Sequence, residues 1–182
     1  MSLSASSRIV YSNPALAPLA DILAVEIEEI THLKLKTSKS SPFSRDIYLT
    51  FTKDPTIKDE KHKVTVSKYA TIEAENYNAV AMGSVTLIQA ISQNGKAYSI
   101  PKMKVVDHPD AEYRGLLVDV ARQYHSIDTL KEVVEMCRLY KVRYLQLHLS
   151  DDQAFTFPST AYPALAEYGN DYTMDEMKDL AR

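Results

Sequence analysis

Over the first hundred residues, segments with strand-like spacing of apolar side chains alternate with segments of helical spacing. Short runs that are apolar, or that alternate apolar with polar residues, predict strands at 8–11, 46–52, 63–68 and 70–74. Residues 14–30 and 77–91 carry apolar side chains at helical spacing. This alternation predicts an α+β domain in which helices cover one face of a sheet.

Local signals predict where these elements begin and end. Asn13 can cap the first helix, with Pro14 at its first position, where a missing N–H costs nothing. The side chains expected on the buried face of that helix are Leu16, Leu19, Ile22, Leu23 and Ile27. Asn94-Gly95 predicts a tight turn before a strand at 97–100. We expect loops at 37–44 and 53–61.

The pattern changes after His108-Pro109. Residues 114–120 form an apolar run typical of a strand buried on both faces of a parallel sheet. Ser126 can cap a following helix, whose apolar face would hold Ile127, Leu130, Val133, Val134 and Cys137. A second strand at 143–150 completes a βαβ unit.

A further helix is predicted near the end of the chain. Thr173 and Glu176 have the spacing of a capping box, and we expect the helix they open to continue to Arg182. A domain rarely ends inside a helix, so we expect the chain to be a piece of a longer protein.

Composition narrows the possible functions. The chain has 182 residues and a net charge of −3, with scattered basic residues, which argues against nucleic acid as a partner. We expect no membrane partner, because no apolar run approaches the ~18 residues that span a bilayer. Cys137 is the single cysteine, so an internal disulfide is impossible. The sequence leaves two alternatives for the compartment. The protein is exported or periplasmic if a signal peptide has been removed, and cytoplasmic otherwise.

Polar residues gather just beyond the carboxyl ends of the two predicted parallel strands. The first group is Asp119, Arg122, Gln123, Tyr124 and His125. The second group is His148, Ser150, Asp151, Asp152 and Gln153. Ligands bind at these ends in α/β proteins, so we expect both groups to face one surface. An arginine there offers a rigid fork of donors to adjacent hydroxyls or to a carboxylate.

Each residue also has a purely structural interpretation. Asp119 is more readily a partner for a neighbouring arginine or backbone N–H, and Arg122 is equally a salt-bridge residue or a ligand clamp. Asp151 and Asp152 alone would be interpreted as a loop or a cap, and His148 as a packed, hydrogen-bonded histidine.

We expect no metal and no cofactor, because no His or Cys pair has ligand spacing. Asp171, Asp175 and Asp179 suit a solvated helix face, and Cys137 suits core packing.

Two multi-residue motifs contain the polar groups: RGLLVDVARQY at 114–124 and LHLSDDQ at 147–153. They resemble motifs of the glycoside hydrolase family 20 β-N-acetylhexosaminidases. The first resembles the family pattern R-G-[LIM]-[LM]-[LIV]-D-x-[AS]-R-x-[YF]. Residues 147–153 (LHLSDDQ) resemble H-x-H-L-x-D-D-Q, although Gln146 replaces the first histidine. Earlier, residues 82–89 (MGSVTLIQ) resemble a helix of the family's small N-terminal domain. The family often has a tryptophan after D-D-Q, where this chain has Ala154.

The resemblance implies an N-terminal α+β domain at 1–108, followed at 109–182 by a truncated (β/α)8 barrel with its first two β/α units only. It also implies substrate-assisted hydrolysis, an exception to the two-carboxylate template of glycosidases. The family's catalytic Asp-Glu pair lies in a G-G-D-E-like segment later in the barrel. We therefore expect no catalytic residue here, and an inactive chain. The alternatives are a non-catalytic carbohydrate-binding or interaction module, and a barrel hydrolase of a neighbouring family.

Two substrate-binding residues can be carried over by resemblance. Arg122 matches the arginine that hydrogen-bonds the 3- and 4-hydroxyls of the terminal sugar. Asp151 matches an aspartate in an Asp–His link to the general acid, with the histidine expected beyond residue 182. The implied partners are glycans with a terminal N-acetylhexosamine. Two barrel strands leave an open edge, so we also expect that the chain self-associates, or that it folds only because the N-terminal domain covers part of the exposed core.

Overall fold

The computed structural model describes residues 1–166 and 171–181 of the chain. The chain divides into two compact units, Met1–Asp110 and Ala111–Arg182. In the described part of the chain, no helix combines the length and apolar character needed to cross a membrane.

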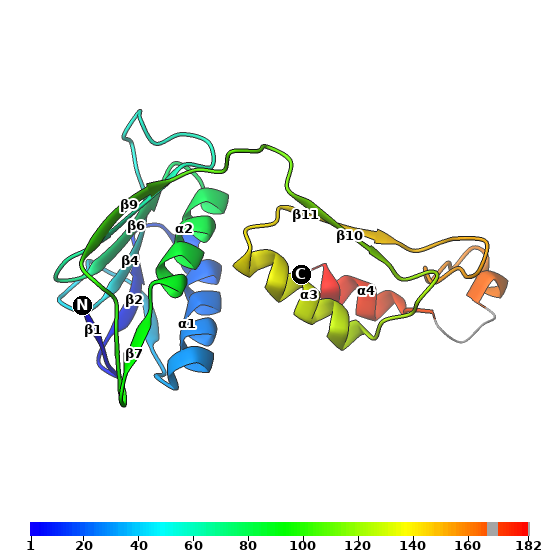
Figure 1. The fold of residues 1–182 in the computed structure, drawn as a ribbon, viewed down its shortest axis with the longest axis horizontal. Coiled ribbons are helices and arrows are strands. Elements are labelled where there is room, and N and C mark those ends of the chain that lie inside the picture. The colour runs from blue at the N-terminus through cyan, green and yellow to red at the C-terminus, as the bar shows by residue number, and fades with distance from the viewer. Residues whose placement is uncertain (167–170, 182) are drawn as a thin grey trace. The chain divides into compact units, whose positions relative to one another are not determined.

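The first unit is built on a six-stranded mixed sheet (Figure 1). Its strand order is β3 (Lys36–Lys39), β2 (Arg8–Tyr11), β4 (Ile47–Phe51), β6 (Ala70–Ala74), β5 (His62–Val66) and β9 (Met103–Asp107). β3, β2, β4 and β6 are mutually parallel, whereas β5 runs antiparallel to β6 and β9. Helices α1 (Ala17–Thr31) and α2 (Tyr77–Gln89) lie on one face of this sheet, as the sequence predicts.

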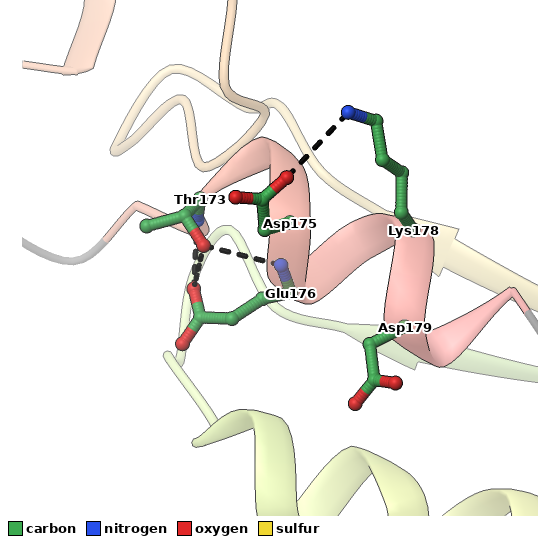
Figure 2. A pocket seen from close by; sticks show the side chains of 5 residues that line it. All are labelled: Thr173, Asp175, Glu176, Lys178 and Asp179. Carbon is green, nitrogen blue, oxygen red and sulfur yellow. Dashed lines mark hydrogen bonds and ion pairs between the residues drawn. The ribbon is translucent and has the colours of Figure 1, made fainter.

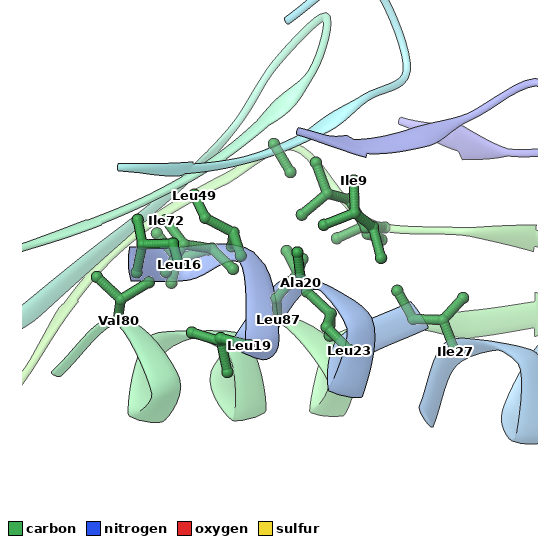
Figure 3. Close-up of a cluster of buried hydrophobic side chains, with 14 of the residues drawn as sticks. Ile9, Leu16, Leu19, Ala20, Leu23, Ile27, Leu49, Ile72, Val80 and Leu87 are labelled. Carbon is green, nitrogen blue, oxygen red and sulfur yellow. The ribbon is translucent and has the colours of Figure 1, made fainter. Parts of the chain in front are cut away.

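The core of this unit lies between the sheet and the two helices (Figure 3). α1 is preceded by a 3-10 turn, η1 (Pro14–Leu16), which Asn13 caps by accepting from the N–H of Ala15. The prediction that Ile22 faces the core is wrong, because this side chain is 46% exposed. Ile22 lies about 100° around the helix from Leu23, outside the buried stripe, and Ala20 occupies the inward position.

The two edge strands of this six-stranded sheet were not predicted from the sequence. Residues 37–44 were expected to form a loop, but Lys36–Lys39 forms β3 and pairs with β2. Its sequence, KTSK, has no apolar period, because an edge strand can be held by backbone hydrogen bonds alone. β9 at the opposite edge was also missed.

A small antiparallel sheet completes the first unit. It consists of β1 (Ser2–Leu3), β8 (Ala97–Ser99) and β7 (Ser92–Asn94). The predicted turn before β8 is confirmed: Gly95 has a φ of 59° and is the first residue between the paired Asn94 and Ala97. Glycine suits that left-handed position because it lacks a Cβ.

The second unit contains two successive β/α pairs. These are β10 (Gly115–Asp119), α3 (Ile127–Leu139), β11 (Tyr144–His148) and α4 (Met174–Leu180), with the 3-10 turn η2 (Pro163–Ala166) between the last two. β10 and β11 are parallel and in register from Gly115↔Tyr144 to Asp119↔His148. The predicted βαβ unit is therefore present, and its small core contains Val120, Leu130 and Tyr172.

Helix caps in this unit agree with the sequence. Ser126 caps α3 by accepting from the N–H of Thr129, and Thr173 and Glu176 form the predicted capping box of α4. The helix does not continue as expected, because α4 ends at Leu180, and Arg182 lies outside the described residues.

The prediction that β10 is buried on both faces is wrong. Leu117 is 55% exposed, and β11 is the one strand with which β10 pairs in the described part of the chain. The Tyr113 ring lies over Gly115 at the start of β10, where a Cβ would come within 2.6 Å of Cζ of Tyr113. The Tyr113 ring is held in place by stacking on Tyr144, with centroids 5.3 Å apart.

Candidate functional site

The loops that follow β10 and β11 leave the sheet at the same edge. Asp119 and His148 are the last paired residues of the two strands. The N–H groups of Val120 and Ala121 both donate to the carbonyl of His148, each at 3.1 Å. The two polar groups predicted from the sequence therefore begin side by side.

Arg122 bridges the two loops through its guanidinium group. Its Nη1 lies 2.6 Å from Oδ2 of Asp119, and its Nη2 lies 2.5 Å from Oδ2 of Asp151. Asp119 also accepts from the N–H groups of Ala121 and Arg122, at 3.1 and 3.0 Å. Asp119 is thus a structural partner, as its interpretation from sequence predicted.

Asp151 is the point at which several contacts converge. Nε2 of His148 lies 2.8 Å from Oδ2 of Asp151, the same oxygen that meets Arg122. The Oδ1 atom accepts from the N–H of Asp152 at 2.8 Å. The Asp151 side chain is 13% exposed and that of Arg122 is 52% exposed. The carboxylate is therefore enclosed, whereas the cation it holds faces solvent.

These contacts set the charge of the site. The backbone and side-chain hydrogen bonds from Arg122 lower the pKa of Asp119. The neighbouring Asp152 and His148 lower the pKa of Asp151, and Asp151 in turn raises the pKa of Asp152. Asp119 and then Asp151 raise the pKa of Arg122. A permanently charged donor fork is thereby held between ionised carboxylates, an arrangement suited to binding vicinal hydroxyls.

The other predicted polar residues have different surroundings. The Tyr124 ring stacks on that of Tyr172, and the carbonyl of His125 accepts from the Tyr172 hydroxyl. Ser150 forms a β-bridge with Phe155. Gln123 and Gln153 are exposed.

Sequence reasoning did not identify Thr156 or Tyr172. Neither belongs to a motif, and Tyr172 is 47 residues away from the His125 carbonyl that it contacts. The capping-box spacing that follows Tyr172 was the nearest signal, and it indicated a helix start rather than a buried tyrosine.

A hollow beside α4 lies on a different part of this unit (Figure 2). It is lined by Thr173, Asp175, Glu176, Lys178 and Asp179. Their polar groups are engaged locally: Thr173 bonds Glu176, Lys178 lies 3.5 Å from Asp175, and Lys131 lies 2.6 Å from Asp179. The hollow is the solvated face of a short capped helix, as predicted for Asp175 and Asp179, whereas Asp171 lies before the first residue of the helix.

Neither metal binding nor thiol chemistry is indicated within residues 1–166 and 171–181. No group of three or more His, Cys, Asp or Glu side chains there could hold a metal ion. Cys137 is buried, and burial raises the pKa of its thiol, which fits the predicted packing role.

The fold and the site define the first two β/α units of a parallel barrel, with a small α+β domain before them. Residues 1–108 match glycosyl hydrolase family 20, domain 2, and residues 112–180 match the glycosyl hydrolase family 20 catalytic domain. The chain belongs to glycosyl hydrolase family 20. The family and fold class expected from the sequence are thereby confirmed.

Individual relatives agree with this assignment. A beta-N-acetylhexosaminidase from Cellulomonas fimi is 35% identical over 109 residues, covering 59% of this chain and 22% of that protein. A beta-hexosaminidase from Akkermansia muciniphila is 30% identical over 166 residues, covering 82% of this chain and 33% of that protein. A mutant Streptomyces plicatus beta-hexosaminidase, solved in complex with GlcNAc, shares the fold, with a TM-score of 0.88 at 24% identity.

The chain is much shorter than these relatives. It spans 22% and 33% of the two sequence relatives and 40% of the Streptomyces plicatus chain. The structural match to the Streptomyces plicatus chain covers 100% of this chain.

Proposed function

We propose that the chain is the N-terminal part of a β-N-acetylhexosaminidase, a retaining glycosidase that releases terminal N-acetylglucosamine or N-acetylgalactosamine by substrate-assisted catalysis. The observation that carries the proposal is the Arg122 fork, held by Asp119 and Asp151 at the carboxyl ends of β10 and β11. In this proposal residues 1–108 form the N-terminal domain, and the barrel begins at residue 109.

Arg122 would act by binding. Its guanidinium offers donors in one plane, and the 3- and 4-hydroxyls of a terminal sugar present acceptors at a matching separation. Two carboxylates keep the fork oriented before the sugar arrives, so less side-chain freedom is lost on binding.

Asp151 would have two roles. It orients Arg122 through Oδ2, and in the whole enzyme it would accept from a histidine linked to the general acid. That histidine and the catalytic Asp-Glu pair are expected outside residues 1–182. The substrates would be glycans that end in N-acetylhexosamine, in keeping with the names of the relatives.

The first test is an activity assay of this 182-residue chain with an aryl N-acetyl-β-glucosaminide. We expect no turnover above the buffer blank, because this chain contains no G-G-D-E-like segment. Turnover that disappears in Arg122→Ala would show that the residues sufficient for catalysis lie within the chain, contrary to the proposal.

A carbohydrate-binding module is the second candidate, favoured by the same observation of an Arg122 fork without a catalytic pair. Tight binding of N-acetylglucosamine by this chain, together with a downstream coding sequence that lacks a G-G-D-E-like segment, would favour the module over the enzyme.

We also propose that the chain self-associates. In this association, a second copy of the chain pairs with the open strand edge of the two-stranded β10–β11 sheet. The exposed Leu116 and Leu117 support this, because the pairing would cover apolar surface as well as backbone groups.

A further inference from the structure

A second, buried connection joins the two loops that carry Arg122 and Asp151. Tyr172 is 0% exposed, and its hydroxyl donates to the carbonyl of His125 at 2.7 Å. Its ring stacks on Tyr124, with centroids 5.2 Å apart and an interplanar angle of 28°. Both contacts fall on the loop after β10, within three residues of Arg122.

The other end of this connection reaches the carboxyl end of β11. The N–H of Tyr172 donates to the carbonyl of Thr156 at 3.0 Å. Thr156 is itself buried, and its N–H and Oγ1 both donate to the carbonyl of Leu149, at 2.8 and 3.0 Å. Leu149 lies two residues before Asp151, so the path runs from one site loop to the other through buried groups.

The ion pair between the loops cannot by itself fix their spacing, because its Arg122 side chain is 52% exposed. Pairs open to solvent are screened and must hold flexible side chains in one geometry, so they contribute little. A buried tyrosine with its hydroxyl satisfied holds its position far more firmly. Burial raises the pKa of Tyr172, so its hydroxyl remains a proton donor at neutral pH.

We propose that Thr156 and Tyr172 are positioning residues that hold the loops after β10 and β11 at the spacing at which Arg122 reaches both Asp119 and Asp151. Their consequence for sugar binding rests on the function proposed above. Their effect on Arg122 does not, and it can be measured without any ligand.

The experiment compares Tyr172→Phe with the wild-type chain by NMR of 15N-labelled arginine, with the Arg122 signals assigned by their loss in Arg122→Ala. Phenylalanine keeps the ring and its stacking and removes the donor to His125. We expect rotation about the Arg122 Nε–Cζ bond to become at least ~3-fold faster in Tyr172→Phe, because the ion pairs that restrain it are broken more often. Tyr162→Phe is the matched control, since Tyr162 is 70% exposed, and it should leave the rate unchanged.

An unchanged Arg122 rotation rate in a folded Tyr172→Phe chain would overturn the proposal. If circular dichroism shows that this variant does not fold, Thr156→Val supplies the same comparison, because it removes the hydroxyl bond to Leu149 at nearly constant volume. Titration with N-acetylglucosamine separates the two proposals. If rotation is faster in Tyr172→Phe and the wild-type chain does not bind the sugar, the positioning role is supported, and sugar binding is then tested in the intact protein. If the wild-type chain binds the sugar and rotation is unchanged in Tyr172→Phe, sugar binding is supported and the positioning role is contradicted.

Discussion

At the scale of the residue, Asp46 illustrates how one buried carboxylate organises the first unit. It accepts from the N–H and Nη2 of Arg8, at 3.1 and 2.5 Å, and from the N–H of Phe43, at 2.8 Å. Burial alone would raise the pKa of Asp46, but the hydrogen bonds from Arg8 and Phe43 outweigh it and hold the pKa below its ordinary value of 3.8.

We predict that Asp46→Asn lowers the free energy of unfolding of the first unit by about 2 kcal/mol at neutral pH, the usual contribution of hydrogen bonds to a charged group. Because the folded-state pKa of Asp46 is depressed, the unfolded chain binds more protons in acid. The contribution of Asp46 is therefore complete above a pH of about 3.8 and is lost as the pH falls through the folded-state pKa.

Urea unfolding at a series of pH values measures this effect. Asp46→Asn should flatten the acid side of the stability profile, whereas Asp110→Asn, at an exposed position, should leave it unchanged. Equal acid sensitivity in Asp46→Asn and wild type would contradict the assignment.

The residues of the site were predictable where a local pattern marks them. Arg122 and Asp151 follow apolar strands and His148 ends one, and the register of β10 and β11 brings them together. Thr156 and Tyr172 were not predictable, because their importance depends on contacts across a long loop. Nothing in the sequence around Tyr172 distinguishes it from an exposed tyrosine such as Tyr162.

At the scale of the element, helices with caps and apolar stripes were predicted well. Asn13 and Ser126 accept from the N–H groups of Ala15 and Thr129, so the chemistry that starts η1 and α3 is visible locally. The edge strands of the six-stranded sheet, in contrast, were not predicted. β3 has no apolar alternation, and its existence depends on the backbone of β2 lying beside it.

β10 is the element for which sequence and structure differ most in burial. Its apolar run is that of a strand covered on both faces, yet its first residues are exposed in this chain.

We predict that the chain self-associates, and that sedimentation velocity over a ~100-fold concentration range shows a rising apparent mass. Leu117→Lys, which places a charge at this exposed position, should abolish the rise. A concentration-independent monomer of the wild-type chain would rule out self-association.

At the scale of the whole molecule, the two units have separate cores, and the proposed site residues all lie in the second unit. The first unit buries a large apolar cluster between its sheet and helices and carries none of the proposed site residues. The second unit has a small core and carries the whole Arg122 network. The family assignment was predictable because two motifs fall at the ends of β10 and β11, where the fold brings their polar residues together.

In the proposed function, Arg122 binds the hydroxyls of a terminal N-acetylhexosamine in the intact protein. The most direct test is the kcat/KM of the full-length protein for an aryl N-acetyl-β-glucosaminide, with Arg122→Ala compared with Arg143→Ala at the opposite end of β11. We predict a loss of roughly 100-fold for Arg122→Ala, as expected when two charge-assisted hydrogen bonds are removed, and a change below about 2-fold for Arg143→Ala. Equal kcat/KM values for Arg122→Ala and the wild type would contradict the account.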